Sequence, residues 1–382
     1  MTEEYLHFIW SLKRIVAPQL TTQHQEPILI KSAGMHNELM AGPDFSHAKI
    51  NIDGIEWHGP VEIHVKSSDW HAHKHHHDSA YNNVVLHVVY EHDKEIEQNG
   101  RMLPTLELKP YIDWEHFNRF EQFKKSKHDI ACAASLKQTN ALFIENMMEK
   151  ALIQKWNQKI QVLEEYIQEP EDAMMKFLGA AFGGHLNMHP FLQTLATIPS
   201  DRLRKMPPIK RYNLLLTQSG MVFNDSKTID RWHFKGNRPG NFPSKRLYQF
   251  AFFMHDEQLK LLAHLSSASE VIDRFDEIMK PKTYQLRLSS SFKNHLLINA
   301  VAPFFYYCAH AEQDERYQDF ALDLLKHLPP ENNNITRKWS NVDRKPKNAW
   351  ESQGLLALHR YYCKAKKCLS CEVGNAIIDR SK

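Results

Sequence analysis

The sequence contains few cysteines and glycines and no long apolar segment. Five cysteines in 382 residues are too few for a disulfide framework and indicate a reducing compartment. No apolar run reaches the roughly 18 residues of a transmembrane helix, and the N-terminus is acidic rather than signal-like. The low glycine count of 13 excludes a fibrous or low-complexity chain. These absences predict an ordered cytoplasmic protein without a membrane partner.

Histidine is the residue type in excess. The chain has 24 histidines, and eleven of them fall between His36 and His92. Histidine is the side chain best suited to bind metals and to transfer protons near neutral pH. Metal binding or proton transfer is therefore expected in this part of the chain.

The first third of the sequence predicts a mixed α/β arrangement. Residues 3–14 have helical spacing, and short strand-like runs follow. Asp53-Gly54 separates two of these runs and is a strong hairpin signal. The run at 84–90 is apolar on both faces, which is typical of a buried central strand. The predicted strands cover 28–30, 47–52, 61–65, 84–90 and 105–108.

The remainder of the chain has helical periodicity. It is interrupted by proline-rich breaks, and no repeat of fixed period is present. The fold class is therefore α+β (α/β): an N-terminal mixed-sheet domain at 1–112, then a mostly α-helical domain at 113–382 with a C-terminal cysteine cluster. Helices are expected at 141–167, 172–183, 211–219, 245–254, 257–265, 293–309, 315–327 and 349–365.

The segment VEIHVK at 61–66 carries the sharpest pattern. Alternation along a strand puts Val61, Ile63 and Val65 toward a core and puts Glu62, His64 and Lys66 on the opposite face. Asp44 comes just before the preceding strand, so a hairpin would bring it beside Glu62. Two carboxylates on adjacent strands form an oxygen-rich site for Mg²⁺ or Mn²⁺. His64 or Lys66 could orient or deprotonate a water molecule there.

This pattern resembles the PD-(D/E)XK nuclease superfamily, with Pro43-Asp44 and Glu62-Ile63-His64 as its motif. The resemblance implies a restriction-endonuclease-like fold and a nuclease activity. His64 stands where the superfamily has lysine, and Lys66 follows on the same face. His64 as a metal ligand, Lys66 in place of the usual lysine, and a degenerate site that binds without cutting are therefore all open. The other interpretation of the segment is a strand with a solvated polar face.

A run of histidines follows this strand. His71, His73 and His75–His77 lie within seven residues, Asp78 comes next, and His87 lies in the buried strand. Several imidazoles could surround one ion, although histidine-rich tracts are a nonspecific signal of metal binding. A solvated loop is the alternative for the run, and a hydrogen-bonded core histidine is the alternative for His87. The predicted metal ligands from this region are His73, His76, Asp78 and His87.

Three cysteines cluster near the C-terminus. Cys363, Cys368 and Cys371 have the spacing C-x4-C-x2-C, which predicts a Zn²⁺ site or an iron–sulfur cluster. Cys132 is the candidate fourth ligand, with Cys308 and His359 as rivals. The alternative is a set of reduced cysteines without a metal.

The net charge is only +3, so any basic surface must be local. Residues 202–211, 231–246 and 335–347 are basic, and aromatic side chains interrupt the last two of these stretches. Such stretches can follow phosphates and stack on bases, although a charge run is more often a solvated face. The residues predicted to contact nucleic acid are Arg231, Lys235, Arg238, Lys245 and Arg246.

Several of these segments together resemble the bacterial family known as domain-of-unknown-function 2851. The resemblance spans most of the chain and implies a soluble bacterial protein, without indicating an activity. It also implies that Cys132 lies in a matching segment. The segments that carry it are 41–45, 61–64, 69–70, 73–78, 81–89, 238–243 and 362–374.

Two classes of function remain after these observations. The first is a metal-dependent phosphodiester hydrolase acting on DNA or RNA, in which Asp44 and Glu62 hold the ion. The second is a non-catalytic nucleic-acid-binding or scaffold protein with a structural Zn or Fe–S site. A zinc hydrolase built on the histidine run alone would require three His or Asp side chains to meet at one point.

Overall fold

The chain divides into two compact units. The computed structural model describes residues 1–15, 17, 19–37, 41–221, 232–236, 239–254, 267–279 and 288–379. The first unit comprises Met1–Cys132 together with Lys366–Lys382, and the second comprises Ala133–Ala365. Residues 113–132 and the C-terminal segment therefore belong with the sheet. Phe120 of helix α3 (Trp114–Lys125) and Ile378 of helix α17 (Glu372–Ile378) share one apolar core with it.

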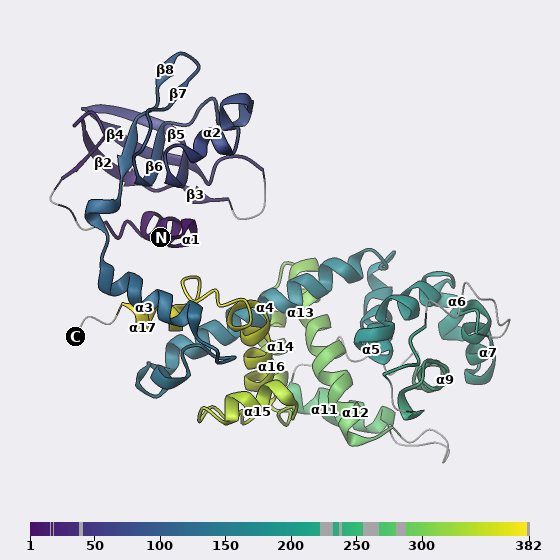
Figure 1. Cartoon of the computed structure of the whole chain (residues 1–382). Coiled ribbons are helices and arrows are strands. Elements are labelled where there is room, and N and C mark those ends of the chain that lie inside the picture. Colours follow the sequence, from purple (N-terminus) through teal and green to yellow (C-terminus); the bar gives the residue numbers. More distant parts are fainter. Residues whose placement is uncertain are drawn as a thin grey trace. The chain divides into compact units, whose positions relative to one another are not determined.

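The first unit contains the predicted mixed sheet (Figure 1). Its strands run in the order β1-β2-β4-β5-β6-β9, with β3 beside β4, and β7 and β8 form a separate hairpin. The pairs β2–β4 and β4–β5 are antiparallel, whereas β5–β6 and β6–β9 are parallel. The bounds are β1 Leu20–Thr21, β2 Pro27–Ser32, β3 Met35–His36, β4 Phe45–Ile52, β5 Ile55–Lys66, β6 Leu86–Glu91, β7 Glu97–Gln98, β8 Arg101–Met102 and β9 Thr105–Glu107.

The Asp53-Gly54 hairpin is confirmed. Ile52 pairs with Ile55, and both turn residues have positive φ, 48° at Asp53 and 82° at Gly54. A two-residue turn of this type matches the twist of the strands it joins, and aspartate followed by glycine tolerates it best. The turn sets the register of β4 against β5 as far as Ala48, which pairs with Gly59. An irregularity between Ala48 and Phe45 then shifts the register, so that Phe45 pairs with Val61 and Asp44 lies beside Glu62.

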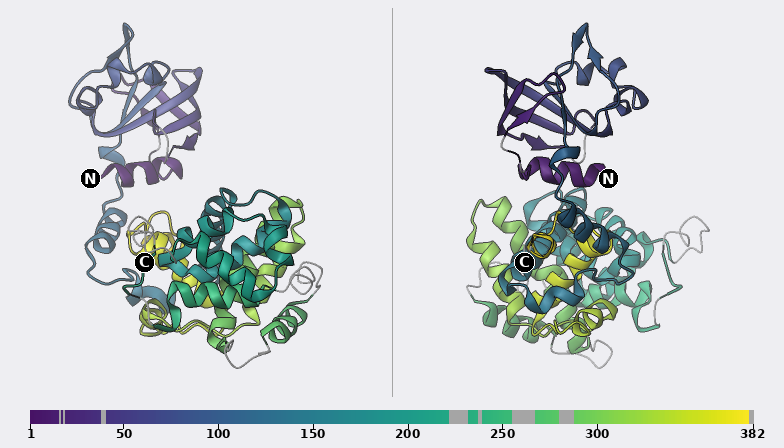
Figure 2. Two further views of the ribbon diagram at one scale, coloured as in Figure 1. Left: turned by 90° about the vertical axis from the view of Figure 1, so that its right-hand side faces the viewer. Right: turned by 60° about the vertical axis from the view of Figure 1, so that its left-hand side comes forward.

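Apolar groups cover both sides of strand β5. Helix α1 (Glu3–Ser11, purple) lies along one side of the sheet in each view, and its Leu6 and Ile9 share a core with Val61 and Ile63 (Figures 1 and 2). A smaller cluster lies beyond β5 and consists of Trp70, Tyr81, Val84, Ile96 and Leu103. The predicted alternation along β5 is therefore present, but Glu62 and His64 are buried as well.

The second unit is helical, as predicted. None of the described helices is both long and apolar enough to cross a membrane. The expected helix at 257–265 lies outside the described residues. The helices of this unit are α4 Ala141–Glu164, α5 Ala173–Ala196, α6 Ser200–Lys205, α7 Pro208–Gln218, α9 Pro243–Phe253, α11 Ala268–Met279, α12 Ser290–Leu296, α13 Ala302–Ala311, α14 Arg316–Lys326, α15 Asn334–Ser340 and α16 Ala349–Leu358.

Candidate metal centre

The histidine run folds back over strand β5 through a series of short turns. Helix α2 (Asp69–Ala72) begins where the carboxylate of Asp69 accepts a hydrogen bond from the backbone N–H of Lys66. Lys74 then adopts a left-handed conformation with φ 64°. The chain continues as the 3₁₀ turn η1 (His75–His77). The reversal at Lys74 turns His75 toward the strand.

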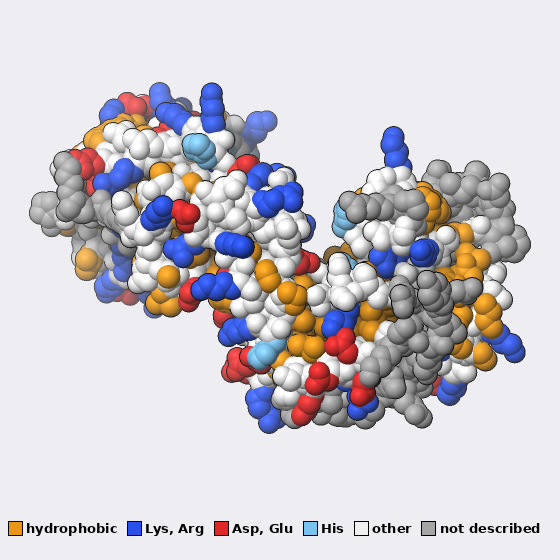
Figure 3. Space-filling view, turned by 90° about the horizontal axis from the view of Figure 1, so that it is seen from below, with side chains coloured by type: hydrophobic (Ala, Val, Ile, Leu, Met, Phe, Trp, Pro, Cys, Tyr) orange, Lys and Arg blue, Asp and Glu red, His pale blue; other side chains and the backbone are white. Residues whose placement is uncertain are grey.

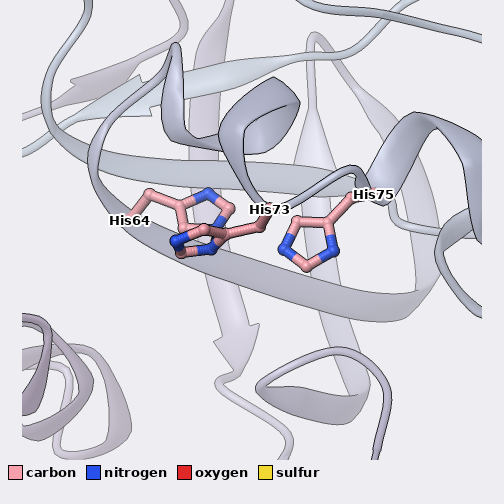
Figure 4. Close-up of side chains that lie close together, drawn as sticks. All are labelled: His64, His73 and His75. Atoms are coloured by element: carbon pink, nitrogen blue, oxygen red, sulfur yellow. The ribbon is translucent and has the colours of Figure 1, made fainter.

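Three imidazoles meet at this point. One ring nitrogen each from His64, His73 and His75 lies within 4.8 Å of the others, and the described residues contain no second such group of His, Cys, Asp or Glu. Figure 4 shows the ring of His75 turned toward the other two, which come from strand β5 and from the end of α2. The single meeting point is thus formed by His73 and His75 of the histidine run together with His64 of strand β5.

The donor atoms have the spacing of a metal site. His64 Nε2 lies 3.1 Å from His73 Nδ1, and the Oε1 atom of Glu62 lies 3.5 Å from His64 Nε2 and 3.2 Å from His75 Nε2. A tetrahedral ion with bonds of about 2.0–2.1 Å keeps its ligand atoms about 3.3 Å apart. Three imidazole nitrogens are therefore close enough to one another to hold a single ion, and the Glu62 carboxyl group lies beside two of them.

Burial adjusts the protonation of these ligands. It lowers the pKa of His64 to about 4, with His75 and His73 adding to the effect, so the ring is neutral and can offer a lone pair. Burial also raises the pKa of Glu62 to about 9, and the neighbouring carboxylates of Asp44 and Glu3 raise it further. Glu62 is only 4% exposed. A cation beside it would offset the cost of ionising this buried carboxyl group.

Two further contacts orient the ligands. His87 is fully buried, and burial holds its pKa well below the usual value, so it is neutral. Its Nε2 lies 2.8 Å from His64 Nδ1. With the proton of His64 on Nδ1 and donated to His87, the Nε2 lone pair of His64 faces the site. On the other side, the ring of Tyr81 stacks on His75 with centroids 3.8 Å apart.

Asp44 lies beside Glu62, as the sequence predicts. Its Oδ2 accepts a hydrogen bond of 2.9 Å from the backbone N–H of Ile63, and its own N–H donates to Glu62 Oε2 at 3.0 Å. Burial acts to raise the pKa of Asp44, but the contacts with His7 and Ile63 outweigh it and lower the pKa. The two carboxyl groups thus differ: Asp44 is ionised, whereas Glu62 holds its proton when no cation is present.

Three residues of this site are absent from the residues predicted from the sequence. His75 was passed over in favour of its neighbour, and helix α1 supplies Glu3 and His7. His7 Nε2 lies 3.2 Å from Asp44 Oδ2, and the carboxyl group of Glu3 is close enough to Asp44 and His73 to interact with their charges. The signal was the spacing of four residues between Glu3 and His7, which puts both on one face of a helix.

The other residues predicted for this site, His76, Asp78 and Lys66, lie outside the group of three imidazoles. His76 packs against His71 and His77, with ring centroids 4.7 Å and 3.9 Å apart. The carboxylate of Asp78 accepts a hydrogen bond from the N–H of Ala80 and caps the next turn, η2 (Ser79–Tyr81). Lys66 is exposed at the end of β5.

The predicted cysteine ligands are divided between the two units. Cys132, Cys368 and Cys371 belong to the first unit. Cys363 belongs to the second, as do Cys308 and His359, the rivals of Cys132. Burial raises the pKa of Cys132 to about 12, and Cys371 and Cys368 add to the shift, so these three thiols are neighbours. The site itself stays a prediction.

The predicted nucleic-acid contacts lie in the second unit. Lys235 and Lys245 are exposed, whereas Arg246 is half-buried, with its guanidinium 3.6 Å from the centre of the Phe292 ring. Arg231 and Arg238 lie outside the described residues. Figure 3 shows Lys and Arg side chains scattered among acidic and uncharged ones over the face in view.

Comparison with known proteins gives one result. The chain matches no curated protein and no solved structure. The model of a family described as "protein of unknown function (DUF2851)" matches residues 3–231 and 223–334, which together cover most of the chain and include the candidate metal centre. The chain therefore belongs to the DUF2851 family.

Proposed function

We propose that the first unit is a metal-dependent phosphodiester hydrolase that acts on DNA or RNA. The observation that carries the proposal is the position of Glu62. Its Oε1 faces the imidazoles of His64 and His75, while its Oε2 accepts the backbone N–H of Asp44. One carboxyl group therefore joins the group of histidines to the ionised carboxylate of Asp44.

The donor set favours a transition metal. Mg²⁺ prefers oxygen ligands and octahedral geometry, whereas imidazole nitrogen suits Zn²⁺ or Fe²⁺. His64, His73 and His75 offer three nitrogen donors to one oxygen of Glu62. Zn²⁺ is thus the first ion to test, ahead of the Mg²⁺ or Mn²⁺ expected from two carboxylates alone.

The side chains of the site have distinct roles in this proposal. A bound divalent cation would polarise a phosphoryl oxygen and acidify a water molecule. Asp44, held ionised by His7 and by the N–H of Ile63, is the group able to accept a proton at neutral pH. His87 would keep His64 in the tautomer that presents Nε2 to the ion.

The order and pairing of strands β4, β5 and β6 support DNA or RNA as the substrate. Asp44 immediately precedes β4, and Glu62 and His64 lie in the antiparallel neighbour β5. After a crossover that contains α2, strand β6 pairs parallel with β5. The PD-(D/E)XK resemblance requires its acidic residue and its E-x-K motif on two such adjacent strands.

A structural zinc site in a non-catalytic protein is the second candidate. Structural zinc sites have four protein ligands, whereas catalytic ones keep a position open for water. The three histidines supply three donors, and Glu62, which lies beside His64 and His75, would have to supply the fourth; His64 is only 1% exposed. The exposure of His73, in contrast, leaves one side of the site accessible to solvent.

The test measures cleavage of labelled DNA and RNA with Zn²⁺, Mn²⁺ or Mg²⁺ and with a chelator. Glu62→Gln should abolish metal-dependent cleavage, and His73→Ala should reduce it by about 100-fold or more. His76→Ala, a neighbour in the same run, is the matched control and should cleave normally. Undiminished cleavage by Glu62→Gln would refute the proposal. Stoichiometric zinc that stabilises the fold without any cleavage would favour the structural candidate.

A further inference from the structure

A groove lies beside the first half of strand β5, where the strand extends beyond its neighbour β6. Strand β6 begins at Leu86, which pairs with Val61, so residues 55–59 of β5 have a neighbouring strand only on the β4 side. The β5–β8 groove in this corner has a volume of about 790 Å³, which lies within the roughly 300–1,000 Å³ of ligand pockets. It is lined by residues 57–60, 82–85, 98–99 and 101–104.

Trp57 presents an aromatic surface to this groove. Its side chain is 39% exposed although it lies within a strand, and Met102 from β8 is 46% exposed on the same groove. In the described part of the chain, no other aromatic ring packs against Trp57. An exposed indole of this kind is a face on which a nucleobase can stack.

Side-chain amides form most of the polar lining. Asn83 and Asn99 are exposed, and Gln98 Nε2 donates to Oδ1 of Asn82 at 3.1 Å. Amides of this type donate to and accept from the edges of bases. The groove thus combines a stacking surface with groups that can pair with the edge of a stacked base.

Arg101 gives the groove a positive charge. It directly follows the Asn99-Gly100 turn, in which φ is 53° and 73°, at the tip of the β7–β8 hairpin that projects from the sheet in Figures 1 and 2. The other titratable side chain of the lining, His58, lies 2.7 Å from Glu56. None of the described residues that line the groove is acidic, so no lining carboxylate opposes Arg101. A guanidinium in this position suits a phosphate group.

The groove is next to the candidate metal centre. Pro60 lines it two residues before Glu62 in the same strand. Asn82 lines it directly after Tyr81, whose ring stacks on His75. A ligand bound in the groove is therefore held close to the site proposed to cleave nucleic acid.

We propose that the β5–β8 groove binds an unpaired nucleotide of single-stranded DNA or RNA. Trp57 stacks on the base, the amides pair with its edge, and Arg101 contacts a phosphate. Bases within a duplex are already stacked on one another, so only an unpaired base can reach the indole. As a statement about substrate, the inference rests on the proposed function and narrows it to single strands.

The test measures binding of a labelled single-stranded oligonucleotide to the full chain by fluorescence anisotropy, with a chelator that prevents cleavage. Trp57→Ala should weaken the affinity about tenfold or more, because a stacking surface is lost, and Trp57→Phe should keep part of it. Trp114→Ala is the matched control, since Trp114 is 50% exposed on α3 and lies outside the groove, and it should bind as the wild type does.

The salt dependence of binding tests the role of Arg101. Arg101→Gln should lower the slope of log affinity against log salt concentration by roughly 0.7, because one phosphate contact is lost. Unlabelled duplex and a mononucleotide serve as competitors. An affinity for the single strand that is unchanged in Trp57→Ala, or is matched by either competitor, would overturn the proposal.

The outcomes for the groove and for the metal centre are separable, because binding is measured without metal. A wild type that cleaves no substrate but binds single strands through Trp57 would refute the hydrolase and support the groove. Cleavage that is abolished by Glu62→Gln, with binding indifferent to Trp57, would support the hydrolase and refute the groove.

Discussion

The two units bury titratable groups of opposite charge. In the first unit, burial raises the pKa of Glu62 to about 9 and lowers the pKa of the neighbouring His64 to about 4. In the second, burial lowers the pKa of Lys159 to about 7, and its partners are neutral oxygens. Each environment favours the uncharged form of its group. Burial thus disfavours a negative charge at Glu62 in the first unit and a positive charge at Lys159 in the second.

Removing a histidine of the metal centre should have the largest effect. His75→Ala should weaken zinc binding by about 100-fold or more, because a direct ligand contributes more than the groups that orient it. Calorimetric titration on chelator-stripped protein measures this affinity. His77→Ala should bind zinc as the wild type does. Equal zinc affinities in the wild type and His75→Ala would contradict a metal site at His75 in the first unit.

Replacing a C-terminal cysteine tests whether thiolates form a second metal site. Cys371→Ser should lose one equivalent of zinc or iron from anaerobically purified protein, because serine is a poor ligand for either. Elemental analysis measures the content, and visible absorbance distinguishes an iron–sulfur cluster from zinc. Cys308→Ser should retain the metal. If all variants contain the same metal as the wild type, these cysteines are unliganded thiols.

The pH dependence of stability should have opposite signs in the two units. The folded pKa of Glu62 lies above its ordinary value of 4.5, so the stability it contributes is full below pH 4.5 and is lost as the pH rises toward about 9. The folded pKa of Lys159 lies below 10.5, so its contribution is full above pH 10.5 and is lost as the pH falls toward about 7. Each group changes stability by at most about 1.4 kcal/mol per pH unit.

Denaturant unfolding of metal-free protein between pH 5 and pH 10 checks both signs. Glu62→Gln should be stabilised relative to the wild type at alkaline pH, and Lys159→Met should be stabilised near neutral pH. Lys150→Met should follow the wild-type curve throughout. If the difference in the free energy of unfolding between Glu62→Gln and the wild type does not change with pH, the raised pKa of Glu62 is contradicted.

The smallest effect is expected at Lys66. Its side chain is exposed, and only its backbone N–H takes part in the turn with Asp69. Lys66→Ala should change the free energy of unfolding by less than about 0.5 kcal/mol, as is typical of surface substitutions, and should leave zinc affinity unchanged. A loss of cleavage of about 100-fold or more in this folded variant would assign Lys66 the role of the superfamily lysine.

Local sequence signals predicted the strands of the site but not its complete set of ligands. The Asp53-Gly54 turn and the alternation of β5 brought Asp44, Glu62 and His64 together, because both signals depend on short-range geometry. The choice between His75 and His76 depended on the left-handed conformation of Lys74. Lysine has no intrinsic preference for that conformation, so the sequence could not indicate it.

The sequence by itself determined the mixed sheet, the helical second unit and the histidine-rich segment within residues 44–87 that contains the candidate metal centre. These properties follow from periodicity, turn residues and residue chemistry along short stretches of chain. The tertiary structure decided which imidazoles meet, that Glu3 and His7 join Asp44, and that the C-terminal segment belongs with the sheet. It also decided that Lys155 and Lys159 point into the helical unit. Such proximity and desolvation depend on packing between segments far apart in the chain, which no local pattern encodes.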